Sequence, residues 1–175
     1  MENHPDAYPV HPHIHLNGIS SLPEGRGAFW NWGPNYTADP IVLTTEDRPQ
    51  VLLIRRQDNN MLALPGGFVD ETDGLNTETA ALRELQEETS LVLNAEGTLV
   101  FEGIVEDPRT TKNAWPETSA YLFEVASPAQ VLAADDAKSA DWYYVDELDA
   151  NELYGSHAAL IQMAIEIQRS RKSKK

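Results

Sequence analysis

Cysteine is missing from all 175 residues of the chain. Disulfides, thiolate nucleophiles and cysteine-ligated zinc are therefore excluded, and the composition favours a reducing compartment. Apolar runs stay far below the roughly 18 residues that a membrane span needs. Residues 1–10 also lack the basic start and the apolar stretch of a secretion signal. The sequence therefore predicts a cytoplasmic protein that has no membrane partner.

Basic residues are scarce outside the C-terminus. The formal net charge is −15, and residues 169–175 hold five of the 13 Lys and Arg, so the rest of the chain carries −20. A body this acidic repels nucleic acid, and we expect no nucleic-acid partner. An anionic ligand must be met by bound metal or by local cations, such as Arg55, Arg56, Arg83, Arg109 and Lys112.

Apolar runs separated by turn residues predict strands over residues 40–45, 50–56, 61–67, 98–107, 118–126 and 140–148. A helix capped by Asn76 follows the polar loop 68–76, and a second amphipathic helix runs from His157 to Arg169. This order predicts an α/β fold in which a mixed sheet lies between helices. Residues 1–38 have no clear period, so we expect an irregular extension that packs on a domain formed by residues 39–175.

Three carboxylates crowd one face of the first predicted helix. Glu84, Glu87 and Glu88 are spaced i, i+3 and i+4, so they lie within about one turn and repel one another. Either a solvated acidic face or a cation among the carboxylates accounts for this pattern. Taken alone, the solvated face is the more common explanation.

The preceding residues change that balance. The stretch LPGGFVDETDGLNTETAALRELQEET, residues 64–89, resembles the box of the Nudix family, whose members hydrolyse a nucleoside diphosphate linked to another group. The resemblance implies a Nudix fold and implies that Glu84, Glu87 and Glu88 bind Mg²⁺ or Mn²⁺ while Arg83 orients one of them. Gly67, with the glycine before it, allows a turn that brings backbone amides close to phosphate.

Two positions depart from the family pattern. The loop after Gly67 is two residues longer than in the family, so the loop acid has two candidate positions: Asp73, and the aligned place that Leu75 occupies. Ser90 stands where the family has glycine at the end of the helix. This difference costs little stability if the helix ends with another geometry.

Three further segments, residues 32–42, 106–118 and 153–161, resemble the ADP-ribose pyrophosphatase subgroup, which includes a mitochondrial animal enzyme and a domain of melastatin-type channels. The resemblance implies that Asp107, Arg109, Tyr154 and His157 contact ADP-ribose, and Arg55 and Gly67 complete the expected substrate-binding set. The structural alternatives are a salt bridge between Asp107 and Arg109, a core position for Tyr154 and a helix-start position for His157.

Other candidates carry weaker signals. Glu117 is either an additional metal ligand or base, or more simply a loop carboxylate. Alternation of His11, His13 and His15 suits metal ligands only in an extended chain, and Pro12 argues against that conformation. Trp115 is the one tryptophan considered for a pocket.

The sequence thus predicts a metal-dependent Nudix pyrophosphohydrolase that converts ADP-ribose to AMP and ribose 5-phosphate. Two alternatives stay open: a Nudix enzyme for another nucleoside diphosphate derivative such as NADH or a nucleotide sugar, and a sensor that binds ADP-ribose without cleaving it. Nothing in the sequence marks an interface, so no oligomeric state is predicted.

Overall fold

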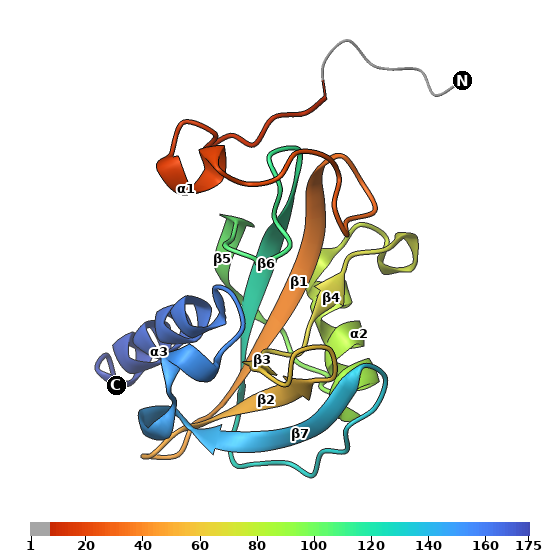
Figure 1. The fold of residues 1–175 in the computed structure, drawn as a ribbon. Coiled ribbons are helices and arrows are strands. Elements are labelled where there is room, and N and C mark those ends of the chain that lie inside the picture. The colour runs from red at the N-terminus through yellow and green to blue at the C-terminus, as the bar shows by residue number, and fades with distance from the viewer. Residues whose placement is uncertain (1–7) are drawn as a thin grey trace.

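A single sheet organises the computed structural model, which describes residues 8–175 (Figure 1). Its strands are β1 (Gly33–Thr44), β2 (Gln50–Arg56), β3 (Leu62–Ala63), β4 (Gly67–Phe68), β5 (Thr98–Ile104), β6 (Ala114–Val125) and β7 (Ala137–Tyr144). The order is β3-β2-β1-β6-β5, with β4 paired to β1 and β7 paired to β2. The long central pair β1 and β6 is parallel, whereas every other named strand pair is antiparallel.

The helices are α1 (Asn17–Ser20), α2 (Thr77–Thr89) and α3 (His157–Lys172), with short 3-10 turns η1 (Glu71–Asp73), η2 (Val145–Glu147) and η3 (Ala150–Glu152). As predicted, Asn76 caps α2, and its side chain accepts a hydrogen bond from the Thr79 N–H at 3.0 Å. The helix ends at Ser90 in the left-handed conformation, with φ +59°. Serine thus adopts here the geometry that glycine usually provides.

The two long helices cover opposite faces of the sheet (Figure 1). Alternation along β1 explains how, because successive side chains of a strand point to opposite faces. Ile41 and Leu43 pack in one apolar cluster with residues of α3, and Ala38 and Val42 pack in the other with residues of α2. The predicted mixed α/β sandwich is confirmed.

The N-terminal segment lies against the loop that precedes β6. His11 N–H donates to Lys112 O at 2.7 Å, Lys112 N–H donates to Pro23 O at 2.9 Å, and Phe29 is 3% exposed. Strand β1 already begins at Gly33, so the predicted boundary after residue 38 falls inside a strand. Over residues 8–175 no helix is both long enough and apolar enough to cross a membrane.

Candidate active site

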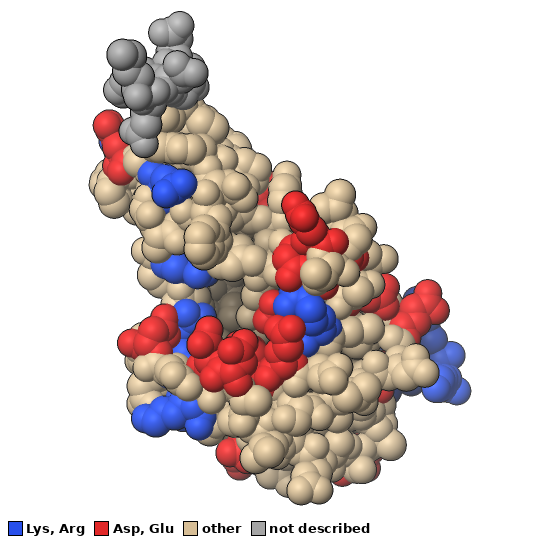
Figure 2. All heavy atoms as spheres, turned by 90° about the vertical axis from the view of Figure 1, so that its right-hand side faces the viewer, with Lys and Arg blue, Asp and Glu red and all other residues tan. Residues whose placement is uncertain are grey.

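A cleft lies beside strands β1, β2 and β4 and is formed by two adjoining cavities. The narrow cavity, about 70 Å³, and the wide cavity, about 670 Å³, share Thr37, Ile54, Arg56, Gly66, Gly67, Glu88 and Arg109 in their walls. Helix α2 supplies Arg83, Glu84, Glu87 and Glu88 to the wide cavity, and Asp107, Tyr154 and His157 line the narrow one. Figure 2 shows a hollow with acidic side chains along one edge and basic side chains beside them.

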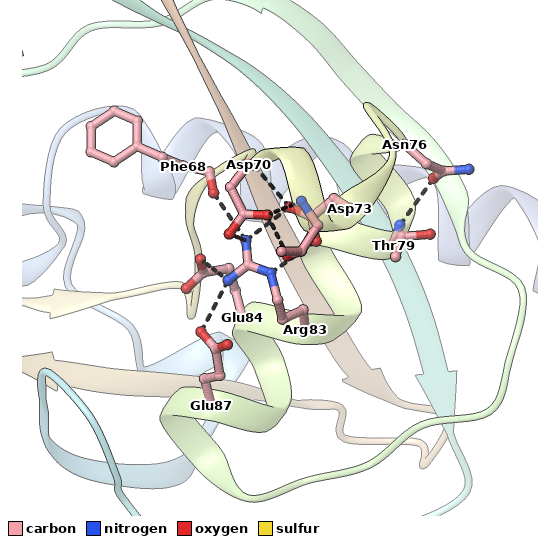
Figure 3. Close-up of polar contacts among 9 residues, drawn as sticks. Phe68, Asp70, Asp73, Asn76, Thr79, Arg83, Glu84 and Glu87 are labelled. Carbon is pink, nitrogen blue, oxygen red and sulfur yellow. Dashed lines mark hydrogen bonds and ion pairs between the residues drawn. The ribbon is translucent and has the colours of Figure 1, made fainter. Parts of the chain in front are cut away.

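Arg83 is the hub of the α2 carboxylates (Figure 3). One terminal nitrogen donates to Glu84 at 2.7 Å and to Glu87, one turn later, at 3.0 Å. The other donates to the Phe68 carbonyl at 3.0 Å. The guanidinium therefore fixes two of the three box carboxylates and ties α2 to β4.

Asp73 completes this arrangement. Its carboxylate takes Arg83 in fork geometry at 2.8 and 2.9 Å and is almost fully buried. It also accepts the backbone N–H of Asp70 at 2.9 Å, and the Arg83 guanidinium holds the pKa of Asp73 below its usual range. Of the two loop positions considered, Asp73 contacts Arg83, whereas Leu75 is 84% exposed. The loop acid thus positions the arginine that positions the glutamates.

Burial distinguishes two of the box carboxylates. Burial raises the pKa of Glu84, and it raises the pKa of Glu88 to about 8 although Glu88 accepts the Gly66 N–H at 3.0 Å. A side chain at Gly67 would stand 2.6 Å from the Glu84 carboxyl carbon, so only glycine leaves room for this approach. Both groups therefore lie where a negative charge lacks water and needs a nearby cation.

This donor set fits a hard divalent cation. Three carboxylates from one helix face converge on the wide cavity, and oxygen is the ligand that Mg²⁺ and Mn²⁺ prefer. Arg83 provides the positive charge for Glu84 and Glu87 in this structure, and residues 8–175 contain no group of three His, Asp or Glu side chains already arranged around one point. A cation would join or replace Arg83 as their partner.

The narrow cavity brings together residues far apart in the sequence. Arg109 holds Asp107 in fork geometry at 2.9 and 2.8 Å, and the Tyr154 hydroxyl donates to the same carboxylate at 3.2 Å. Tyr154 is 5% exposed, and the guanidinium of Arg56 lies 4.1 Å from its ring centroid. Asp107, Arg109 and Tyr154 are therefore in direct contact, and the guanidinium of Arg56 lies over the tyrosine ring.

His157 begins α3 and faces a buried carboxylate that the sequence did not reveal. Its Nδ1 accepts the Leu64 N–H at 2.9 Å, and its Nε2 lies 4.0 Å from Asp39 Oδ1. Asp39 is 7% exposed, accepts a hydrogen bond from the Thr118 hydroxyl and lines the narrow cavity. In the sequence, the feature that could have identified Asp39 is its position next to the apolar run of β1.

Arg55 is the member of the predicted set that the structure does not bring to the cleft. Its guanidinium donates to the Asn60 carbonyl at 2.8 Å, and it lies in the wall of neither cavity. Arg56 lines both cavities instead, because Ile54 and Arg56 share one side of β2 while Arg55 points to the other.

The weaker candidates lie outside the cleft. Glu117 accepts the indole N–H of Trp115 at 3.1 Å, and Trp115 is 4% exposed with its ring against His11. Neither Glu117 nor Trp115 lines either cavity. His11 accepts the His13 N–H through Nδ1 at 3.0 Å, so this imidazole nitrogen serves a local turn.

Comparison with known proteins matches residues 35–163 to the NUDIX domain. The chain belongs to the Nudix family. Its relatives include a nudix hydrolase of Caenorhabditis elegans, 36% identical over 171 residues, and the mitochondrial ADP-ribose pyrophosphatase of Rattus norvegicus, 31% identical over 178 residues. These alignments cover 89% and 81% of this Nudix chain but only 62% and 50% of those relatives, so the chain spans about half to three-fifths of their length.

A channel also matches, as the subgroup resemblance predicted. The protein named transient receptor potential cation channel subfamily M member-like 2, from Nematostella vectensis, is 32% identical to this chain. The alignment covers 79% of this chain and 11% of the channel. Among solved structures, the NUDIX domain of Shewanella oneidensis NrtR complexed with ADP ribose superimposes with a TM-score of 0.66, at 26% identity over 80% of this chain and 90% of that one. The predicted family resemblance is confirmed.

Proposed function

We propose that this Nudix chain hydrolyses ADP-ribose to AMP and ribose 5-phosphate with the help of a divalent cation. The observation that carries the proposal is the cleft itself: carboxylates of α2 line its wide cavity, and Asp107, Tyr154 and His157 line its narrow cavity. The rat relative named for ADP-ribose cleavage and the NrtR domain bound to ADP ribose support the choice of substrate.

The proposed roles follow from the contacts. Glu84, Glu87 and Glu88 would hold Mg²⁺ or Mn²⁺, which supplies charge neutralisation at the phosphates and acidifies water. Arg83 keeps two of these carboxylates in place. In the overall reaction an oxygen of water bonds to one phosphorus of the pyrophosphate and the bridging P–O bond breaks. The narrow cavity, lined by Asp107 and Tyr154, would take the hydroxyl-bearing part of the substrate.

The test is phosphate release in an assay coupled to a phosphatase that attacks only monoesters. ADP-ribose, NADH, ADP-glucose and GTP would be compared with Mg²⁺, with Mn²⁺ and with a chelator. We expect ADP-ribose to dominate and the chelator to abolish the signal. Cleavage of another compound in its place would keep the Nudix chemistry but overturn the substrate assignment.

Binding without turnover would identify the non-catalytic alternative. A sensor would bind ADP-ribose and release no phosphate under any metal condition, although the three carboxylates of the box are present.

For the compartment, we propose the cytoplasm on the basis of the cysteine-free composition. Because the rat relative is mitochondrial by name, cell fractionation with a mitochondrial marker is the deciding measurement.

A further inference from the structure

The cations of the cleft differ in how much of their binding capacity is already used. Three arginines line the wide cavity: Arg56, Arg83 and Arg109. The chain outside its basic tail carries a formal charge of −20, so a diphosphate entering this cleft depends on local positive charge. Such a diphosphate needs a guanidinium whose hydrogen-bond donors the protein can release.

Arg83 has no donor left for a ligand. Its Nε and one terminal nitrogen donate to Asp73, and that nitrogen also donates to the Phe68 carbonyl. The remaining nitrogen donates to Glu84 and Glu87. Since a guanidinium has five N–H groups, Arg83 is saturated by the protein.

Arg109 is held by a buried partner. Its Nε and one terminal nitrogen donate to Asp107, whose side chain is 8% exposed. The same carboxylate accepts the Arg109 backbone N–H and the Tyr154 hydroxyl. Removing this arginine from Asp107 would leave a buried carboxylate without its charge partner, which is strongly unfavourable.

Arg56 is placed differently. Its planar group lies 4.1 Å from the centroid of the Tyr154 ring, which fixes its orientation between the two cavities. Its ion-pair partner, Asp58, lies at the surface, where its side chain is 61% exposed. The Asp58 carboxylate accepts two hydrogen bonds from Arg56, at 2.9 and 2.7 Å. Within residues 8–175 the second terminal nitrogen of Arg56 makes no hydrogen bond.

We propose that Arg56 is the diphosphate-binding cation of the cleft and that substrate phosphate replaces Asp58 as its partner. An exposed carboxylate returns to water at little expense, and a guanidinium binds phosphate in the same fork geometry as carboxylate. Tyr154 then acts as the platform that orients Arg56. This inference rests on the proposed hydrolysis of a diphosphate compound and names the residue that recognises it.

The chain provides a matched control on the same strand. Arg56→Gln removes the cation from the cleft, whereas Arg55→Gln removes an identical charge one residue away on the opposite side. We expect Arg56→Gln to raise KM for ADP-ribose about 10- to 100-fold with a kcat change below about fivefold, the loss of one charge-assisted hydrogen-bond set. Arg55→Gln should change KM less than about twofold.

A second pair of variants tests the exchange of partners. Asp58→Asn frees Arg56 and should lower KM about two- to fivefold, in the range of an exposed ion pair. Asp47→Asn removes the same charge from an exposed position outside both cavities and should change KM less than about twofold. A purely structural Arg56 predicts instead that Asp58→Asn leaves KM unchanged or raises it.

The outcomes separate this inference from the proposed function. If the wild type cleaves ADP-ribose and Arg56→Gln matches Arg55→Gln in KM, the inference is overturned and the function stands. If the wild type prefers another diphosphate compound, the same four variants are measured on that compound with the same expectations. If the wild type cleaves nothing, titration calorimetry with ADP-ribose replaces KM by Kd, and a wild type that neither cleaves nor binds overturns both proposals.

Discussion

Among single residues of the box, Glu87 differs from the buried Glu84 and Glu88 in its exposure to solvent. Its side chain is 45% exposed, against 12% for Glu84. Glu87→Gln should therefore leave the fold intact, because it removes a charge from a largely solvated group and relieves like-charge repulsion along α2. We expect kcat to fall about 100-fold or more, since loss of even an outer partner of a metal ligand typically lowers activity about 10- to 100-fold.

Glu96→Gln is the control for this variant because Glu96 is exposed and lies in the wall of neither cavity. Activity and thermal unfolding are measured for both variants beside the wild type. Full activity of Glu87→Gln, or its loss of folding with normal activity in the folded fraction, would contradict the metal-ligand assignment.

Asp39 provides a prediction on pH dependence. Burial raises the pKa of Asp39 in the folded chain, so the protonated carboxyl is favoured by folding and ionisation is penalised. The stability that the neutral group contributes is present at low pH and is lost as pH rises through the folded pKa. Asn cannot ionise, so the unfolding free energy of Asp39→Asn relative to wild type should rise as pH increases from about 4 to 8.

Urea unfolding of the two proteins across that range measures the difference directly. His157 is 4.0 Å from Asp39, and its pKa is lowered by burial and raised by the Asp39 charge, so the difference between the two proteins reports on the Asp39–His157 pair. A difference between the two proteins that stays flat would show that Asp39 keeps an ordinary pKa in the fold, and a difference that falls with rising pH would show that its pKa is lowered.

At the scale of elements, local rules predict α2 better than the strands. Asn76 accepts the expected capping hydrogen bond, and the spacing of the glutamates follows from helical geometry alone. Strand β1 begins at Gly33, seven residues before the expected start, because Gly33 pairs with Ala114 of β6. That pairing joins residues about 80 positions apart, and no local pattern around Gly33 announces it.

The end of α2 provides a stability prediction. Ser90 adopts φ +59°, a conformation that costs a residue with a side chain about 1 kcal/mol, and its hydroxyl donates to the Leu132 carbonyl at 3.0 Å from an exposed position. Ser90→Gly should raise the free energy of unfolding by about 0.5–1 kcal/mol, because glycine relieves the backbone strain and the lost hydrogen bond is solvated.

Ser90→Ala is the matched comparison for the helix end. Alanine keeps the strain and loses the same hydrogen bond, so it should lower the free energy of unfolding by a few tenths to about 1 kcal/mol. Both values come from urea unfolding at one pH. Equal effects of Gly and Ala would show that the hydroxyl, and not the backbone conformation, determines stability at this position.

At the scale of the whole molecule, the cleft depends on contacts that no single segment predicts. Asp39 comes from β1, Arg56 from β2, Asp107 from the loop before β6 and His157 from the start of α3. The sequence named Asp107 and His157 through a family resemblance, but it placed the β2 cation at Arg55. The side of a strand that faces a cleft depends on its pairing with neighbouring strands, which the residues of β2 alone do not determine.

Phe29 tests whether the N-terminal segment and the sheet unfold together. Its ring is 3% exposed, lies 6.4 Å from the Phe68 ring of β4 and 5.3 Å from the Arg109 guanidinium. Phe29→Ala should lower the unfolding free energy of the whole chain by about 3 kcal/mol, whereas Trp30→Ala, at a residue 78% exposed, should change it by less than about 0.5 kcal/mol. Calorimetry should show one transition that moves with Phe29→Ala. An early separate transition, with the main one unmoved, would show that the segment is not part of the cooperative unit that builds the cleft.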